Sequence, residues 1–157
     1  MKAGLAGLKV TIHFEVIRSL IVASILILGV ACARPSDETQ IRDALTAMQK
    51  AVEAGKPADF MAHVADDFTG EAGTLDRAAL HNLLRGQALT NTHIGVSLSL
   101  VEVELRGDRA TVRATVALTG GNGRWIPERG SIHRIESGWR KHDGDWRCIN
   151  AEWERSL

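Results

Sequence analysis

The stretch "SGWRKHDGDWRCINAEWE", residues 137–154, has the pattern of a β-hairpin near the end of the chain. Its centre is Asp143-Gly144, a dipeptide favoured in two-residue turns whose backbone needs positive φ angles. Trp139 and Trp146 flank this turn, at positions that lie near each other across two antiparallel strands. Such cross-strand aromatic pairs stabilise a sheet by about 0.2–1 kcal/mol. The end of the chain is therefore predicted to be antiparallel sheet, with these tryptophans packed in its core.

The sheet pattern extends backwards along the chain to about residue 94. Apolar residues occupy even positions over residues 94–100 and odd positions over residues 101–105. Because side chains alternate along a strand with a period of two, this switch predicts a β-bulge that bends one long strand. A second strand is expected over residues 110–118 and a third over about 131–141, before the final hairpin. Together these segments predict a curved, bulged antiparallel sheet of about four long strands.

The segment before the sheet has a helical pattern. Ile41, Leu45, Met48 and Val52 recur every three or four residues and form one apolar stripe. Capping residues and helix breakers predict three helices in succession. The expected boundaries are Ser36 or Asp37 to Gly55 for the first helix, a start at Pro57 for the second, and Thr74 or Asp76 to just before Gly86 for the third. The predicted fold class is α+β, with three helices packed against the sheet.

An apolar run precedes the predicted domain. Residues 20–31 are 12 consecutive positions without a charge, whereas a helix that crosses a bilayer needs about 20. With Lys2, Lys9 and Arg18 upstream, the run matches a secretory leader, and residues 1–31 are predicted to be cleaved. Because the leader carries a net positive charge, its removal leaves a slightly acidic protein. No clustered basic segment is present, so nucleic-acid binding is not expected.

The cysteine after this run, Cys32, is expected to carry a lipid. The sequence "GVAC" at residues 29–32 resembles the lipobox of bacterial lipoproteins, while "ACA" at residues 31–33 fits cleavage by ordinary signal peptidase. In the first interpretation residues 32–36 are a lipidated cysteine and a tether, and acyl chains hold the protein on a membrane. The expected location is the periplasmic face of the bacterial cell envelope, with the outer membrane preferred because alanine follows the cysteine. A soluble periplasmic or secreted protein is the alternative.

Three features together resemble the nuclear transport factor 2-like superfamily of cone-shaped α+β domains. They are the order of helices and bulged sheet, the "VADDF" at residues 64–68, and the Trp-x-x-x-Asp-Gly-x-Trp pattern of residues 139–146. The resemblance covers about residues 37–155 of a domain predicted to span residues 37–157. It implies a curved sheet that wraps the first helix and leaves a pocket open at one end. The superfamily includes ketosteroid isomerase-like and polyketide cyclase-like enzymes, dehydratases, ligand-binding modules and association domains.

The resemblance also implies candidate catalytic residues. Enzymes of this kind use a pocket carboxylate as general base and hydrogen-bond donors that hold a developing enolate. Glu71 is the nearest equivalent of that base, and Asp67 is the alternative. His63 is four residues before Asp67 and would assist as a proton carrier if the helix continued. The alternative is a structural role without catalysis. In that interpretation Asp66 and Asp67 hold the turn after the helix, and His63 is hydrogen-bonded to a carboxylate.

Other polar residues are expected to line the pocket if the polar face of the strands is the concave one. They are Arg113, Arg134, Asn150 and Glu152, with Trp125 either over the pocket mouth or covering the sheet edge. The histidines show no metal-ligand spacing, so neither a metal site nor a cofactor is expected. Cys148 is interpreted as a small buried hydrophobe, and no internal disulfide is predicted.

The chain has no tyrosine, a common hydrogen-bond donor in the enzymes it resembles. A pocket without both a placed base and an oxyanion site supplies little rate. We therefore expect a lipoprotein whose domain binds a small apolar or amphipathic molecule, or a protein partner, without catalysis. One alternative is a proton-transfer enzyme of the isomerase, cyclase or dehydratase kind, with Arg113 or Arg134 stabilising the anion. A second alternative is an assembly module that forms a homodimer through its sheet.

Overall fold

The computed structural model describes residues 35–91, 93–121 and 129–156, and these fold as an α+β unit. Three α-helices pack against one six-stranded mixed sheet. The expected leader, Cys32 and Trp125 lie outside the described residues. In the described part of the chain, no helix has the length and apolarity needed to cross a membrane.

The helices begin where the capping residues predict. Helix α2 spans Asp37–Glu53, and the Ser36 hydroxyl accepts a hydrogen bond from the Thr39 amide at 3.2 Å. Helix α3 spans Pro57–Met61, with proline in its first turn. Helix α4 spans Arg77–Thr90, and the Asp76 carboxylate accepts from the Ala79 amide at 2.7 Å.

One helix boundary differs from the prediction, because α4 continues through Gly86 to Thr90. A glycine inside a helix lowers its stability by only about 0.5–1 kcal/mol relative to alanine, so one such residue does not end the helix. The extra turn carries Gln87 and Thr90 to the edge of the large pocket described below.

Six strands follow the order β2-β1-β6-β5-β4-β3 across the sheet. Their bounds are β1 Val64–Gly70, β2 Leu75–Asp76, β3 His93–Arg106, β4 Arg109–Gly121, β5 Arg129–His142 and β6 Asp145–Arg155. The four long strands were predicted, whereas β1 and β2 were not. Strand β1 is not a regular alternation of buried and exposed residues, and it pairs with β6 in parallel through a contact distant in sequence. A 3-10 turn, η1 Glu71–Gly73, connects β1 to β2.

Two irregularities bend the long strands. The register of β3 against β4 shifts between Ser99 and Glu102, at the place where the apolar pattern predicts a bulge. A second shift, which the sequence analysis did not predict, lies between β5 and β6. There Gly138 is opposite Asn150 while Trp139 is opposite Cys148, so β6 contains one extra residue. Because one extra residue reverses the alternation, the faces of β6 exchange at this point.

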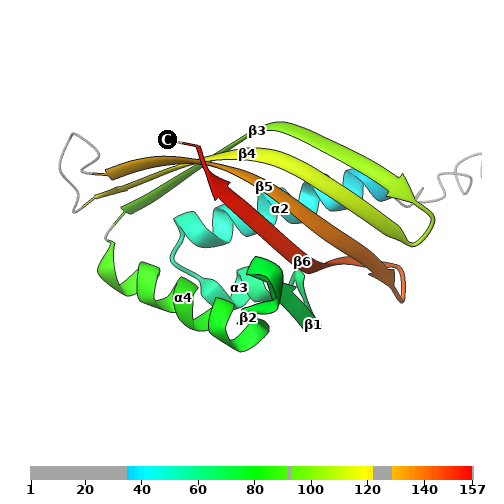
Figure 1. Ribbon diagram of the computed structural model, residues 1–157, viewed down its shortest axis with the longest axis horizontal. Helices are drawn as coiled ribbons and strands as arrows, with labels where there is room; N and C mark the ends of the chain where they lie inside the picture. Colours follow the sequence, from blue (N-terminus) through cyan, green and yellow to red (C-terminus); the bar gives the residue numbers. More distant parts are fainter. Residues whose placement is uncertain (1–34, 92, 122–128, 157) are drawn as a thin grey trace, which may run out of the picture. The chain divides into compact units, whose positions relative to one another are not determined.

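The helices lie on one face of the sheet, as Figure 1 shows. Helix α2 contacts β3 and β6, and α4 contacts β1 and β2. The core between these layers includes Trp139 and Trp146, which are 1% and 4% exposed. The predicted core position of the two hairpin tryptophans is therefore confirmed.

Candidate functional site

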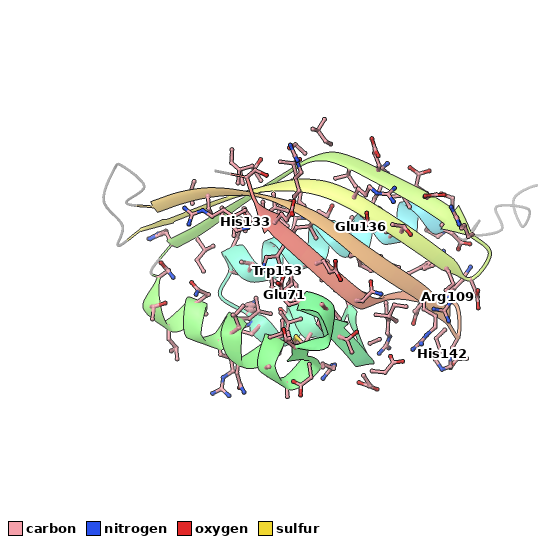
Figure 2. All side chains as sticks on the ribbon, viewed as in Figure 1. Glu71, Arg109, His133, Glu136, His142 and Trp153 are labelled. Carbon is pink, nitrogen blue, oxygen red and sulfur yellow. The ribbon has the colours of Figure 1, made fainter. Side chains whose placement is uncertain are left out.

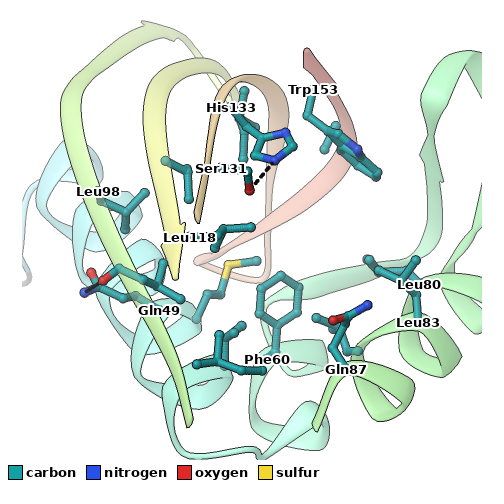
Figure 3. Close-up of a pocket in the computed structure, with 18 of the residues that line it drawn as sticks. Gln49, Phe60, Leu80, Leu83, Gln87, Leu98, Leu118, Ser131, His133 and Trp153 are labelled. Atoms are coloured by element: carbon teal, nitrogen blue, oxygen red, sulfur yellow. Dashed lines mark hydrogen bonds between the residues drawn. The ribbon is translucent and has the colours of Figure 1, made fainter. Parts of the chain in front are cut away.

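A large pocket lies between the inner face of the sheet and the helices (Figure 3). Its volume is about 1070 Å³. Most of its lining is apolar and comes from α2, α3, β1, α4 and the four long strands. The apolar lining residues are Leu45, Met48, Val52, Phe60, Val64, Phe68, Leu80, Leu83, Leu84, Ile94, Val96, Leu98, Val116, Leu118, Ile135, Trp139, Cys148, Ala151 and Trp153.

Strand β5 contributes a pair of polar groups to this apolar surface. The Ser131 hydroxyl and the His133 Nε2 are 3.0 Å apart on the sheet side of the pocket (Figure 3). The other ring nitrogen of His133, Nδ1, is buried and has no hydrogen-bond partner among the described residues. An unpaired buried N–H is rarer than an unpaired buried acceptor. We therefore assign the ring hydrogen to Nε2, which donates to Ser131 and leaves the serine O–H available as a donor.

A similar pair lies farther along the same face of β5. The Trp139 Nε1 donates to the Ser137 hydroxyl at 3.0 Å, and both residues line the pocket. Ser137 is only 6% exposed, although its hydroxyl is polar. Because the serine oxygen accepts from the indole, its own hydrogen can be donated to a second group.

The pocket lining contains basic side chains but no acidic ones among the described residues. The basic residues of the lining are Arg155 and His133. These two residues are direct cross-strand partners in the register of β5 and β6. Ser131 lies two residues from His133 on the same face, so the three side chains gather at one end of the sheet.

Two predicted pocket residues, Asn150 and Glu152, line a second, smaller pocket instead. This pocket has a volume of about 410 Å³ and also involves Gly70 and Glu136. The Asn150 Oδ1 accepts a hydrogen bond from the Gly138 amide at 2.7 Å, beside the register shift of β6. In a regular strand Asn150 and Cys148 would share one face, because they are two residues apart. The extra residue in β6 places Cys148 in the large pocket and Asn150 outside it.

The other two predicted pocket residues, Arg113 and Arg134, line neither of these two pockets. The Arg113 Nε donates to the Glu136 carboxylate at 2.8 Å on the outer face of the sheet (Figure 2 labels Glu136). Arg134 is exposed and lies between two residues of the pocket-facing side. The prediction placed the polar face of the strands toward the pocket, whereas the helices cover the apolar face, as burial of apolar area requires.

The predicted base Glu71 lies at the start of η1 and lines neither pocket. Its Oε1 is buried and has no hydrogen-bond partner among the described residues. Glu71 and Ala72 have φ angles of 49° and 53°, a left-handed conformation that is strained for residues other than glycine. The geometry gives Glu71 an unusual environment but no place in the apolar pocket.

The predicted pair of His63 and Asp67 is not formed. Helix α3 ends at Met61, so the two residues do not share a helix face. Asp67 instead accepts hydrogen bonds from both terminal nitrogens of Arg140, at 2.8 and 3.0 Å, and this guanidinium lowers the pKa of the carboxyl group. Partial burial lowers the pKa of His63, and the charge of Arg147 acts in the same direction.

The described residues contain no group of three His, Cys, Asp or Glu side chains arranged to hold a metal ion. Cys148 is a free thiol in this part of the chain and is 4% exposed. Its Sγ donates to the Asn150 carbonyl at 3.2 Å. Burial raises the pKa of this thiol to about 12, so the unreactive thiol form is favoured at neutral pH.

The model of one protein family, described as the SnoaL-like domain, matches residues 33–151. The chain belongs to this family. The resemblance to the nuclear transport factor 2-like superfamily is thereby confirmed, and solved structures with the same fold support it. No curated protein matches the sequence.

The SnoaL-like domain is similar to several solved structures at low sequence identity. A Novosphingobium aromaticivorans protein, provisionally assigned as a scytalone dehydratase, has a TM-score of 0.67 and 17% identity over 77% of this chain and 85% of that chain. Aln2 from a Streptomyces species has a TM-score of 0.68 and 12% identity over 77% and 93%. A Streptomyces avermitilis protein of the NTF2-like family, provisionally assigned as a dehydratase, has 0.65 and 19% over 77% and 96%. At these identities the likeness shows the fold.

The polar groups of the SnoaL-like pocket were not among the predicted site residues. Sequence patterns assign His133 to a strand without metal-ligand spacing and give Ser131 no role. A usable signal was nevertheless present. Trp139 marks the inner face of β5, and counting back from it in steps of two reaches Ser137, His133 and Ser131.

Proposed function

We propose that the domain binds a small, predominantly apolar molecule in the large pocket between the sheet and the helices. The observation that carries this proposal is a volume of about 1070 Å³ with a mainly apolar lining and a few convergent polar groups. Small-molecule sites have this character, with volumes of about 300–1,000 Å³. The proposal is binding without carboxylate-based catalysis, because no acidic side chain of the described residues lines the pocket.

A second candidate function is proton transfer by His133. The observation in its favour is that an imidazole hydrogen-bonded to the Ser131 hydroxyl lies in an apolar pocket, an arrangement in which His can act as acid or base. The SnoaL-like family contains isomerases, dehydratases and cyclases, which is consistent with this alternative as much as with binding. Turnover of a bound molecule that is lost in His133→Gln, with binding retained, would favour the enzyme over the binding protein.

We further propose that a lipid on Cys32 anchors the domain at the cell envelope, with its periplasmic side as the location. The lipobox-like sequence supports this anchor. Mass spectrometry of the protein from its own cells should give a chain that begins at Cys32 and carries acyl groups. A chain that begins at Arg34 without lipid would instead indicate a soluble periplasmic or secreted protein.

Binding in the pocket is testable with the neutral fluorescent probe N-phenyl-1-naphthylamine. We expect saturable fluorescence enhancement with the unaltered protein. In Leu118→Trp the larger side chain occupies pocket volume. The affinity for the probe, obtained from the fluorescence titration, should fall about tenfold or more, because the loss of about 1.4 kcal/mol of apolar contact raises Kd by that factor.

The matched control is Ala117→Trp, which adds the same indole at the next residue of β4, on the opposite face of the sheet. This variant should bind the probe like the unaltered protein. Equal binding by the unaltered protein and both variants would show that the probe binds elsewhere and would contradict the proposed function.

A further inference from the structure

We propose that the pocket selects an amphiphile with an anionic oxygen group, such as a long-chain carboxylate, and holds that group between Ser131 and Arg155, with His133 orienting the serine hydroxyl. The inference rests on the proposed binding function and adds the ligand's charge and orientation. Its carrying observation is that Arg155, Ser131 and His133 lie together at one end of a mainly apolar lining that contains no aspartate or glutamate among the described residues.

The three residues occupy one end of the pocket. His133 is opposite Arg155 in the register of β5 and β6, and Ser131 is opposite Leu118 in the register of β5 and β4. Toward the other end of β5 the pocket wall is formed by Trp139, six residues from His133. At about 3.4 Å per residue, the strand places these two ends about 20 Å apart. The pocket therefore has a charged end and a mainly apolar interior, in which Ser137 and Trp139 form a neutral polar pair. This arrangement matches an amphiphile rather than a uniformly apolar molecule.

The hydrogen bond at the polar end sets the direction in which a ligand can be bound. With the ring hydrogen on Nε2, His133 donates to Ser131, and the serine O–H is left to donate to a ligand oxygen. An acceptor such as a carboxylate or carbonyl oxygen satisfies this donor. A ligand ammonium group has donors only, so it cannot accept this hydrogen.

The charges at this end act in the same direction. The Arg155 guanidinium contributes a positive charge at the rim of the pocket, where it is exposed and also interacts within the protein. No aspartate or glutamate among the described residues belongs to the pocket lining. An anionic head group at this rim is attracted by the guanidinium, and a cationic head group is repelled.

The test is displacement of N-phenyl-1-naphthylamine by three amphiphiles of equal chain length: decanoate, decanol and decyltrimethylammonium, all below their micelle concentrations. We expect decanoate to displace the probe at a concentration about tenfold lower than decanol does. A hydrogen bond to a charged group is stronger than a neutral one by enough free energy to change the affinity by about that factor. Decyltrimethylammonium should be the weakest competitor. Equal displacement by all three would overturn the inference while leaving the proposed binding function intact.

Variants assign the preference to the polar end. In Arg155→Gln and in Ser131→Ala, the concentration of decanoate that displaces the probe should rise close to that of decanol, relative to the probe affinity measured for each variant. The control is Arg134→Gln, which removes the same charge from the adjacent position on the outer face. Loss of the preference in Arg134→Gln to the same degree would show a general surface-charge effect and overturn the inference. If the probe does not bind the unaltered protein, the proposed function and the inference both fail.

Discussion

Cys148 lies on the inner face of β6, where its thiol is enclosed by the core and by the wall of the pocket. The chain around it supplies only a carbonyl acceptor, from Asn150. A thiolate has no compensating donor or cation at this position, so burial favours the neutral thiol and raises its pKa to about 12. This one residue therefore couples the stability of the core to alkaline pH.

The raised pKa predicts a loss of stability above pH 9. Below its unfolded-state pKa the thiol is neutral in both states, and its stabilising contribution is fully present. As pH rises from about 9 toward 12, the unfolded chain loses this proton more readily than the folded one, so the free energy of unfolding falls by up to about 4 kcal/mol. Urea unfolding of the protein and of Cys148→Ala across this range should show a steeper fall for the unaltered protein. Parallel pH profiles would contradict this account of the thiol.

Single residues also show where sequence reasoning about the site stopped. His63 and Asp67 were predicted to share a helix face if the helix continued, but β1 begins at Val64. Asp67 then accepts a hydrogen bond from Arg140, which is 73 residues away in sequence. A local sequence pattern cannot predict such a distant pairing. Asn150 was misplaced because a single extra residue in β6 reverses which side chains face inward.

At the scale of elements, α2 protects the free edge of the sheet. Strand β3 is the last strand of the sheet, and an unpaired edge is a template for association with another chain. Two side chains of α2 occupy this edge at one residue. The Gln49 Nε2 donates to the Val96 carbonyl at 2.8 Å, and the Glu53 carboxylate accepts from the Val96 amide at 3.1 Å. At Val96, helix α2 thus supplies the two hydrogen bonds that a further strand would make.

Removing this edge contact should weaken the fold and expose the strand. We predict that Gln49→Ala with Glu53→Ala lowers the free energy of unfolding by about 1–3 kcal/mol, because the Val96 backbone loses both partners. Self-association should rise with protein concentration in sedimentation velocity. The control is Lys50→Ala, an exposed change on the same helix. A double variant as stable and as monodisperse as Lys50→Ala would contradict the edge-protection account.

Elements with strong local signals were predictable, and elements defined by distant pairing were not. The α2 start followed from Ser36, and the four long strands followed from alternation and from Asp143-Gly144. Strand β2 has two residues, and β1 gains its strand conformation by pairing with β6, far away in sequence. Both were missed because neither has a periodic pattern of its own.

At the scale of the whole described unit, the pocket is built from segments that are far apart in the chain. Helices α2 and α4 supply one side, and the inner face of β3 to β6 supplies the other. The outer face of the sheet carries charged residues such as Arg113, Arg134 and Glu136. The apolar surface of the sheet instead lines an interior large enough for a guest molecule.

The most direct test of this account is a methyl NMR titration of the protein with N-phenyl-1-naphthylamine. The account predicts that methyl signals of the pocket residues Leu80, Leu84 and Leu118 shift progressively with probe concentration. Signals of Leu100 and Leu105, exposed on β3 and absent from the pocket lining, should stay in place. Shifts confined to Leu100 and Leu105, or no shift at any methyl group up to probe saturation, would contradict a ligand-binding pocket in this domain.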